Sequence, residues 1–596
     1  MRQTGWGMKN SIADGKYVQN TLIKHEMATI VAVLGVTIST FGNTLLAGRF
    51  IGKSALAAMN ILSSFTFLYA MIGCLVSVGA ASKAAVALGK HDYDMAGKYE
   101  KVAFALSIII PTIISTICLI NLRWFMSFLG FDSELYLMSV AYGKVVLVGG
   151  IFNTLMYFPF NFLRIDGRAK YSMWIFSLMG VLDLILVYVL LSLGFGLTGV
   201  AMGNVLSMMI ADFIGLAFIF SKKSNIRMVK LGKKEIVPIT GSALYAGSAS
   251  GLNNLCKVFR TIWLNSLVLR FLGTDGVSVL AIGCAIINFA SAAVTGFGMA
   301  MYPLVGVLYG EHDSDGQKKV MNGSLKNSSV VMISLGIVLC IFAENVARAF
   351  GITEPELIGQ AALMIRLVAI SLIPATYMNE YIYYYTAIGE NVAAMTFTVL
   401  HSFILVVLMI SAHLRIDAST WYGVEFIFVE FVDFAILWGY SKYKRAKDHN
   451  LKTILLTPKR SDEIFFSAVS SGTYDDNMAL VEKVEDFCRD NKVSFKGIRI
   501  PMVVEEISIL MANHCLKEDY TGIDVKISVL RNTIIVRTRC GGEMFNPVTW
   551  FAHEEEIDSD SEELFGMRMV DKMATDIRYT QLFGLNNVIV TMEGHS

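Results

Sequence analysis

Charged residues are scarce over most of this chain. Only 55 of the first 442 residues are Asp, Glu, Lys or Arg, whereas the last 154 residues hold 44. The chain of 596 residues is 17% charged and 54% hydrophobic, against about 25% charged in an ordinary soluble protein. This split excludes a single large soluble enzyme and a disordered protein. It predicts a membrane body followed by a water-soluble tail.

Several common signals are also missing. The eight cysteines form no C-x-x-C pair, so neither a structural zinc site nor a disulfide framework is expected. No G-x-x-x-x-G-K-[ST] loop occurs, which excludes an ATP-powered pump of that type. Neither part has a dense Lys/Arg stripe, so we expect no nucleic-acid partner. Residues 1–26 are polar and lack a signal-peptide core. We predict no cofactor and no metal.

Apolar residues in the membrane part fall into twelve runs. Each is long enough for a helix of about 20 residues to cross the bilayer. The runs cover residues 27–48, 55–88, 102–122, 136–162, 171–193, 197–220, 240–269, 277–309, 325–350, 360–387, 393–413 and 420–441. Basic residues concentrate in the loops that follow even-numbered runs, for example at residues 222–234. Since short cytoplasmic loops are rich in Lys and Arg, both termini are predicted to be cytoplasmic.

The two halves of the membrane part repeat one another. Five loop anchors of the first half recur in the second half at offsets of 221–224 residues. The pairs are Arg49–Gly52 with Arg270–Gly273, Gly89–Asp92 with Gly310–Asp313, Gly130 with Gly351, Gly167 with Gly389, and Gly199–Val200 with Gly423–Val424. Because six helices is an even number, the halves share one orientation, and a parallel repeat of this kind indicates a transporter.

The predicted fold class is an all-α polytopic membrane protein with a C-terminal α/β domain of the α+β sandwich type. Its parts follow from the runs and the change in charge. They are a cytoplasmic segment (1–26), an N-lobe of six helices (27–220), a linker (221–239), a C-lobe of six helices (240–442), a second linker (443–463) and a cytosolic domain (464–596).

Residues 27–442 resemble the multidrug and toxic compound extrusion (MATE) family. The resemblance rests on Gly42-Asn-Thr-Leu-Leu-Ala-Gly48 followed by Arg49-Phe-Ile-Gly-Lys-Ser-Ala-Leu-Ala-Ala58, on Leu163-Arg-Ile-Asp-Gly167, on Gly196-Leu-Thr-Gly-Val-Ala201, and on Tyr302-Pro-Leu-Val-Gly306 with Tyr309-Gly310. It implies a V-shaped fold of two lobes around a central cavity. It also implies export of drug-like or metabolite compounds against an inward sodium or proton gradient.

The chain departs from the family where a coupling ion is expected. The family usually has an aspartate in the first helix and an asparagine in the fifth, but this chain has Asn43 and Asp183. An ionisable side chain at membrane depth usually faces a cavity or a partner. We predict that Asp183 either exchanges a proton or binds sodium together with Asn43. The alternative is a hydrogen-bonded structural aspartate.

The C-lobe sequence holds more charge. Two interpretations are open for Lys257, Arg260, Glu380 and Glu430: an ion-pair network inside the lobe, or a proton relay in which Glu380 and Glu430 titrate and Arg260 tunes them. The tyrosines after Glu380 form either an aromatic wall for flat cations or an interfacial belt. We assign the substrate cavity to Asn153, Asn161, Arg260, Tyr381 and Tyr384.

The tail predicts helices at residues 477–491, 500–516 and 563–574, and strands at 525–530, 533–538 and 587–592. It resembles the histidine-kinase-like ATPase fold, in its anti-sigma-factor branch, through Glu505-Glu506, His514, the Gly542-Glu-Met-Phe-Asn-Pro547 segment and Gly566. The expected nucleotide ligands are replaced, because Leu510 and Cys540 stand at the Mg²⁺ and adenine positions. We therefore predict a degenerate pocket at Glu506, Leu510, Cys540, Gly542 and Gly566, and a domain that regulates or binds a protein. ATP binding is the less favoured alternative.

Three functions remain open at this stage. The first is a cation-coupled antiporter in the plasma membrane, with the bilayer, a small organic substrate and a coupling cation as partners. The second is a related exporter of lipid-linked or anionic cargo, because Lys257 and Arg260 place cations in the membrane. The third is a membrane-anchored signalling protein whose output is the tail. Substrate, coupling ion and oligomeric state do not follow from the sequence.

Overall fold

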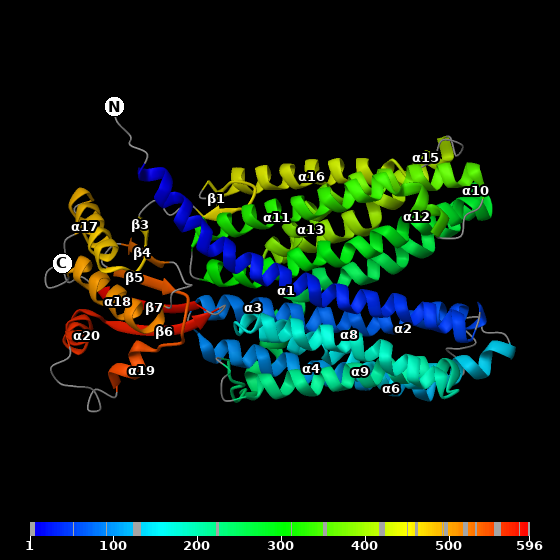
Figure 1. Cartoon of the computed structure of the whole chain (residues 1–596), viewed down its shortest axis with the longest axis horizontal. Helices are drawn as coiled ribbons and strands as arrows, with labels where there is room; N and C mark the ends of the chain where they lie inside the picture. The colour runs from blue at the N-terminus through cyan, green and yellow to red at the C-terminus, as the bar shows by residue number, and fades with distance from the viewer. Residues whose placement is uncertain are drawn as a thin grey trace. The chain divides into compact units, whose positions relative to one another are not determined.

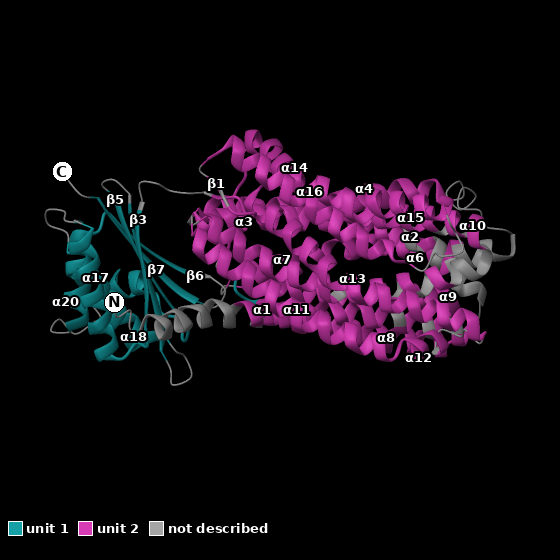
Figure 2. Cartoon of the chain, turned by 90° about the horizontal axis from the view of Figure 1, so that it is seen from above, with its two compact units in different colours: residues 1–21, 166–168, 458–596 teal, residues 22–165, 169–457 magenta. Residues whose placement is uncertain are grey.

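In this computed structural model the chain is mainly helical and forms two compact units (Figure 2). One unit comprises residues 22–165 and 169–457, and the other comprises residues 1–21, 166–168 and 458–596. The structure describes residues 6–51, 53–90, 92–122, 133–221, 224, 226–310, 313–349, 354–416, 423–449, 451–458, 463–491, 493, 499–516, 522–530, 533–552, 562–582 and 585–593.

The unit of residues 22–165 and 169–457, drawn magenta in Figure 2, contains two sets of helices, which are blue to cyan and green to yellow in Figure 1. Residues 6–21, at the start of the first helix, belong to the other unit. The first set is α1 (Trp6–Phe50), α2 (Lys53–Gly73), the π-helix η1 (Cys74–Val78), α3 (Gly79–Gly89), α4 (Tyr93–Ile120), α6 (Ser133–Leu155), α7 (Tyr157–Ile165), α8 (Ala169–Ser192) and α9 (Gly196–Ile219). The second set is α10 (Lys233–Gly310), α11 (Ser314–Ile341), α12 (Ala343–Ala349), α13 (Pro355–Ile388), α14 (Asn391–Val399), the π-helix η2 (Leu400–Ile404), α15 (Leu405–Ile416) and α16 (Glu425–Lys447).

Ten helices of the described residues are long and apolar enough to cross a membrane. Their outward faces are apolar too: Ile113, Ile117 and Ile120 of α4 follow a helical spacing and are 54%, 52% and 77% exposed. Neither of the predicted runs 240–269 and 420–441 is among the ten, although residues 240–269 are helical within α10 and residues 425–441 within α16. Each carries ionisable residues, such as Lys257 in α10 and Glu430 in α16, that lower its hydropathy.

The two helix sets meet most closely where α3 lies against α10. A Cβ atom added at Gly89 would lie 2.2 Å from the carbonyl oxygen of Val307, and one added at Gly310 would lie 2.3 Å from that of Val86. Residues 86 and 89 are each 221 positions before 307 and 310, so the contact is reciprocal. Glycine is required on both sides because real Cβ atoms do not approach a backbone oxygen so closely. The repeat anchors at residues 52, 91, 130, 311 and 351 lie outside the described residues.

The tail folds into an antiparallel five-stranded sheet with strand order β3-β4-β5-β7-β6. After the small pair β1 (Leu451–Lys452) and β2 (Thr457–Pro458), the elements are β3 (Glu463–Ser470), α17 (Tyr474–Asp490), α18 (Ile500–Cys515), β4 (Ile523–Leu530), β5 (Thr533–Cys540), α19 (Pro547–Ala552), α20 (Glu562–Met573), β6 (Asp576–Leu582) and β7 (Leu585–Glu593). In the central strands Ile527 pairs with Val536, which pairs with Val590. All three are buried with the apolar faces of α17, α18 and α20 in one core.

All three helices and three strands predicted for the tail are present within a few residues. Strands β3 and β6, which are the two edge strands of the sheet, were not predicted from the sequence. An edge strand is covered less completely, so its apolar pattern is weaker than that of a central strand. The small antiparallel sheet of the predicted fold class is therefore confirmed.

Candidate functional site

Asp183 of α8 lies at the centre of a polar cluster formed by three helices. Its side chain is 2% exposed. The Nδ2 atom of Asn43 in α1 donates to Asp183 Oδ2 at 2.7 Å, and Ser39 of the same helix also donates to that oxygen. On the opposite side, Asn204 Nδ2 of α9 lies 3.4 Å from both carboxylate oxygens. The structure thus places the two predicted coupling residues, Asn43 and Asp183, in direct contact.

Small residues allow α1 and α8 to approach one another at this cluster. A Cβ atom added at Gly180 would lie 2.6 Å from the carbonyl oxygen of Gly35, so only glycine fits at residue 180. The Oδ1 atom of Asn43 is buried and has no hydrogen-bond partner among the described residues. A carboxylate beside a free amide oxygen is the type of oxygen-donor set that holds a hard cation, and it also suits a proton carrier.

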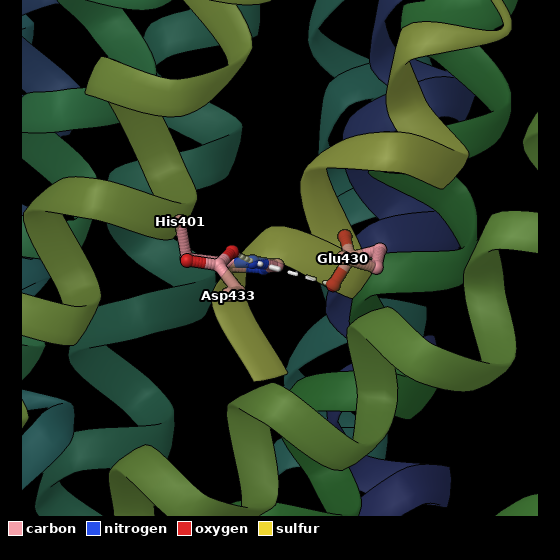
Figure 3. A group of neighbouring side chains, drawn as sticks. All are labelled: His401, Glu430 and Asp433. Atoms are coloured by element: carbon pink, nitrogen blue, oxygen red, sulfur yellow. Dashed lines mark hydrogen bonds and ion pairs between the residues drawn. The ribbon is translucent and has the colours of Figure 1, made fainter. Parts of the chain in front are cut away.

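A second polar cluster lies in the second helix set (Figure 3). His401 Nδ1 lies 2.9 Å from Asp433 Oδ2 and 3.5 Å from Glu430 Oε2. Glu430 and Asp433 are one turn apart on α16, and His401 belongs to the π-helix η2. A short π-helical segment within an α-helix is frequently found at a functional site. One ligand atom from each of the three residues lies within 4.8 Å of the others. Arg260 is within electrostatic reach of Glu430 and His401, which disfavours an added divalent cation.

Glu380 does not join Glu430 in one relay. It is fully buried on α13, where its electrostatic neighbours are Glu26 of α1 and the hydroxyls of Ser324 and Ser328 on α11. Neither carboxylate oxygen of Glu380 has a hydrogen bond of good geometry within the described ranges. Glu26 accepts a hydrogen bond from Asn327 Nδ2 at 2.7 Å. The C-lobe acids therefore divide into two clusters, because Glu380 and Glu430 contact different neighbours.

A cavity of about 90 Å³ lies inside the second helix set. Lys257, Arg260 and His401 line it, together with amide and hydroxyl groups such as those of Asn253, Asn379 and Ser402. No acidic residue is among its lining residues. Within the described parts of the chain, neither Lys257 nor Arg260 forms an ion pair within 4.0 Å. The predicted ion-pair network of the C-lobe thus does not include these two cations.

Of the predicted substrate-cavity residues, only Arg260 lines this cavity. Asn161 accepts a hydrogen bond from Tyr302 at 3.0 Å and is fully buried between the helix sets. Tyr384 is also fully buried and donates to Gln317 at 2.9 Å. Tyr381 packs edge-on against Phe434. Asn153 of α6 is buried, outside the lining of this cavity. Tyr381 and Tyr384 thus pack against other side chains, and neither lines this cavity.

Asp212 and Glu26 carry buried carboxyl groups that were not among the predicted site residues. Asp212 of α9 is 1% exposed, and neither of its carboxylate oxygens has a partner among the residues that the structure describes. Glu26 of α1 is 2% exposed. The sequence could have indicated Asp212, since this ionisable residue lies inside the apolar run 197–220. Glu26 precedes the run 27–48 by one residue and was therefore counted as part of the polar N-terminal segment.

The residues of the predicted nucleotide pocket are closely packed at several positions, although Glu506 also lines a pocket beside α17 and α18. Leu510 and Cys540 belong to the apolar core and are 2% and 0% exposed. Gly542 has a φ of +110°, and a Cβ atom there would lie 1.8 Å from the carbonyl oxygen of Cys515. A Cβ atom at Gly566 would lie 1.9 Å from Glu506 Oε2. The Glu506 carboxylate thus occupies the space beside Gly566, where a phosphate group would need access to backbone N–H groups.

Glu506 gives a pH-dependent prediction for the tail. The pKa of its carboxyl group is raised, mainly by partial burial and to a smaller extent by the nearby charges of Glu505 and Glu562. The folded state therefore disfavours the charged form, and stability falls as the pH rises. We expect Glu506→Gln to stabilise the tail at about pH 8 and to have little effect at about pH 4, near the ordinary pKa of glutamate.

Pulse proteolysis of the full chain in urea, read on fragments of residues 458–596, measures this effect. Glu482→Gln on α17 is the matched control, since the side chain of Glu482 is exposed. An equal change in stability at both pH values would contradict the prediction.

Comparisons with known proteins agree with this architecture. The MatE family model matches residues 28–189 and again residues 249–410, which together exceed half of the chain. No curated protein matches. Among solved structures, a MATE protein in complex with MaL6 is 20% identical, with a TM-score of 0.67. A MOP superfamily transporter from Pyrococcus furiosus is also 20% identical, with a TM-score of 0.66. Each comparison covers 72% of this chain and 97% of the other.

An outward-facing multidrug resistance MATE family transporter of the MOP superfamily is 19% identical to this chain. It has a TM-score of 0.67, again over 72% of this chain and 97% of the other. At this level of identity the likeness concerns the fold. The family model, by contrast, matches the amino-acid sequence itself, at two separate stretches. MATE proteins are secondary transporters and not enzymes. This chain therefore belongs to the MatE family of multi-pass membrane transporters.

Proposed function

We propose that this protein is a secondary active exporter of drug-like or metabolite organic compounds across the plasma membrane. Inward movement of Na⁺ or protons drives the export, and both termini are cytoplasmic. The observation that carries the proposal is the buried Asp183 carboxylate, which meets donors from α1 and α9. A lone carboxylate at membrane depth is costly unless it serves ion movement or is permanently hydrogen-bonded.

The proposal includes twelve crossings in two lobes of six helices. Three observations support it. The family model matches from residue 28 and again from residue 249, which is 221 positions later. The contacts of Gly89 and Gly310 are reciprocal. The anchors Gly167 and Gly389 both adopt a left-handed backbone, with φ of +82° and +83°. Two such lobes that rock about α3 and α10 give access to alternate sides of the membrane.

The tail acts as a regulatory or docking domain in this proposal and not as a motor. Support comes from its core, because Leu510 and Cys540 offer no ligand to Mg²⁺ or adenine. Export should therefore depend on the ion gradient and persist when ATP is removed.

Efflux from everted membrane vesicles tests the proposal. A sodium gradient and a proton gradient are imposed separately, and dye accumulation is followed with Asp183, Glu380 and Glu430 neutralised one at a time. Accumulation under one gradient that collapses with the matching ionophore supports a secondary antiporter. Accumulation that needs ATP and persists without any gradient would contradict it.

A further inference from the structure

We propose that the cavity in the second helix set binds an organic anion, so that the carboxylate, phosphate or sulphonate group of an exported compound lies beside Lys257 and Arg260. The inference rests on the proposed export function and specifies the class of substrate. It concerns the cavity lined by α10, α13 and the segment around η2.

One face of α10 supplies the polar wall of the cavity. Ser250, Asn253, Lys257 and Arg260 follow one another at spacings of three or four residues. This spacing places them in line on a single helix face. The face therefore presents two cations and two neutral polar groups to the same space.

The remaining walls add hydrogen-bond donors without adding acids. Ser402 donates to Asn253 Oδ1 at 2.8 Å, which leaves the NH₂ group of Asn253 as the donor end of that amide. Tyr383 and Asn379 of α13 and His401 of η2 also line the space. An anion prefers a site of this composition, since charge-assisted hydrogen bonds from Lys and Arg are stronger than neutral ones.

The nearest acids are placed away from the cavity. Glu430 and Asp433 contact the Nδ1 side of His401 and are not among the lining residues. Glu430 is within electrostatic reach of Arg260 and His401, and Asp433 is within reach of His401. Neither acid forms a direct ion pair with Lys257 or Arg260 within the part of the chain described. Lys257 and Arg260 are partly buried. A cation at membrane depth without a direct partner is costly, and an incoming anion reduces that cost.

The size of the cavity limits what enters it. A volume of about 90 Å³ is far below the roughly 300–1,000 Å³ of a typical pocket for a drug-sized ligand. The site therefore holds a charged group, with the rest of the compound outside it. An apolar cation finds no carboxylate there, so the substrate preference should be opposite to that expected for cationic drugs.

Two dyes with the same xanthene ring system test the charge preference. Fluorescein is an anion, and tetramethylrhodamine methyl ester is a cation. Their binding to the full chain in zwitterionic nanodiscs is followed by fluorescence anisotropy, and their gradient-driven accumulation is followed in proteoliposomes. We expect fluorescein to bind more tightly. Lys257→Gln and Arg260→Gln should each raise its Kd about tenfold or more, as expected for loss of one charge-assisted hydrogen bond.

Matched variants separate charge from folding. Lys144→Gln removes an exposed lysine from α6 and should leave fluorescein binding unchanged. Arg260→Lys keeps the charge and should retain most of the binding that Arg260→Gln loses. The inference is overturned if the cationic dye binds more tightly, or if Lys257→Gln behaves like Lys144→Gln.

Two further outcomes identify the source of the anion and separate this inference from the export function. Fluorescein binding can be compared between zwitterionic nanodiscs and nanodiscs that contain phosphatidylglycerol. Loss of binding in the second would assign the cavity to a lipid head group and overturn its assignment to cargo. Fluorescein binding that depends on Lys257, without accumulation of either dye under any gradient, would support the anion site and contradict the exporter.

Discussion

Asp183→Asn is expected to reduce gradient-driven efflux by about a hundredfold, to the background of vesicles without transporter. The amide oxygen of the new asparagine can replace Asp183 Oδ2, which accepts from both Ser39 and Asn43. Its NH₂ group then faces Asn204, at the longer distance of 3.4 Å. The fold should therefore survive, while the charge that binds sodium or carries a proton is lost.

A double variant that exchanges the residues at positions 43 and 183 tests the same prediction more stringently. The double variant Asn43→Asp with Asp183→Asn returns one carboxylate to the same cluster, because the two side chains are 2.7 Å apart. We expect it to recover a substantial part of the efflux lost by Asp183→Asn. Asp315→Asn, in an exposed pair with Lys318, is the control and should transport normally. Normal efflux by Asp183→Asn, with intact thermal unfolding, would contradict a coupling role.

Gly89→Ala and Gly310→Ala are expected to impair transport although each adds only one methyl group. The new Cβ atoms would lie 2.2 and 2.3 Å from backbone oxygens of the opposite helix set. Backbone cannot move aside as a flexible side chain does, so α3 and α10 must separate. Overpacking of this kind costs about 1–3 kcal/mol. Because the two contacts are reciprocal, the two variants should lose stability and efflux to a similar extent.

Gly439→Ala is the matched control for this pair. Gly439 lies within α16, and an added Cβ atom meets nothing within 4 Å. Alanine in a helix interior is favoured over glycine by about 0.5–1 kcal/mol, so this variant should be neutral or slightly stabilised. Thermal unfolding in detergent, together with vesicle efflux, measures both effects. Equal stability of Gly89→Ala and Gly439→Ala would disprove the close contact of α3 with α10.

Local patterns in the sequence were sufficient for the helices, the central strands and the ionisable positions. Apolar runs of membrane length predict spanning helices wherever charge is absent, because the bilayer requires apolar side chains and internal backbone hydrogen bonds. Alternating apolar residues likewise predicted β4, β5 and β7, which are buried in the centre of the tail sheet. The edge strands β3 and β6 were missed since partial exposure weakens that alternation.

Only the tertiary structure decided which residues that are distant in the sequence contact one another. Asn43 and Asp183 were predicted to act together, but only the packing of α1 on α8 shows that their side chains are 2.7 Å apart. One of the two interpretations of the C-lobe charges joined Glu380 and Glu430 in a relay, yet Glu380 interacts electrostatically with Glu26 and Glu430 lies beside His401. The sequence by itself determined which side chains are costly in a membrane. Which of them meet depends on contacts between helices, and those follow from side-chain shape and close glycine contacts that no local pattern records.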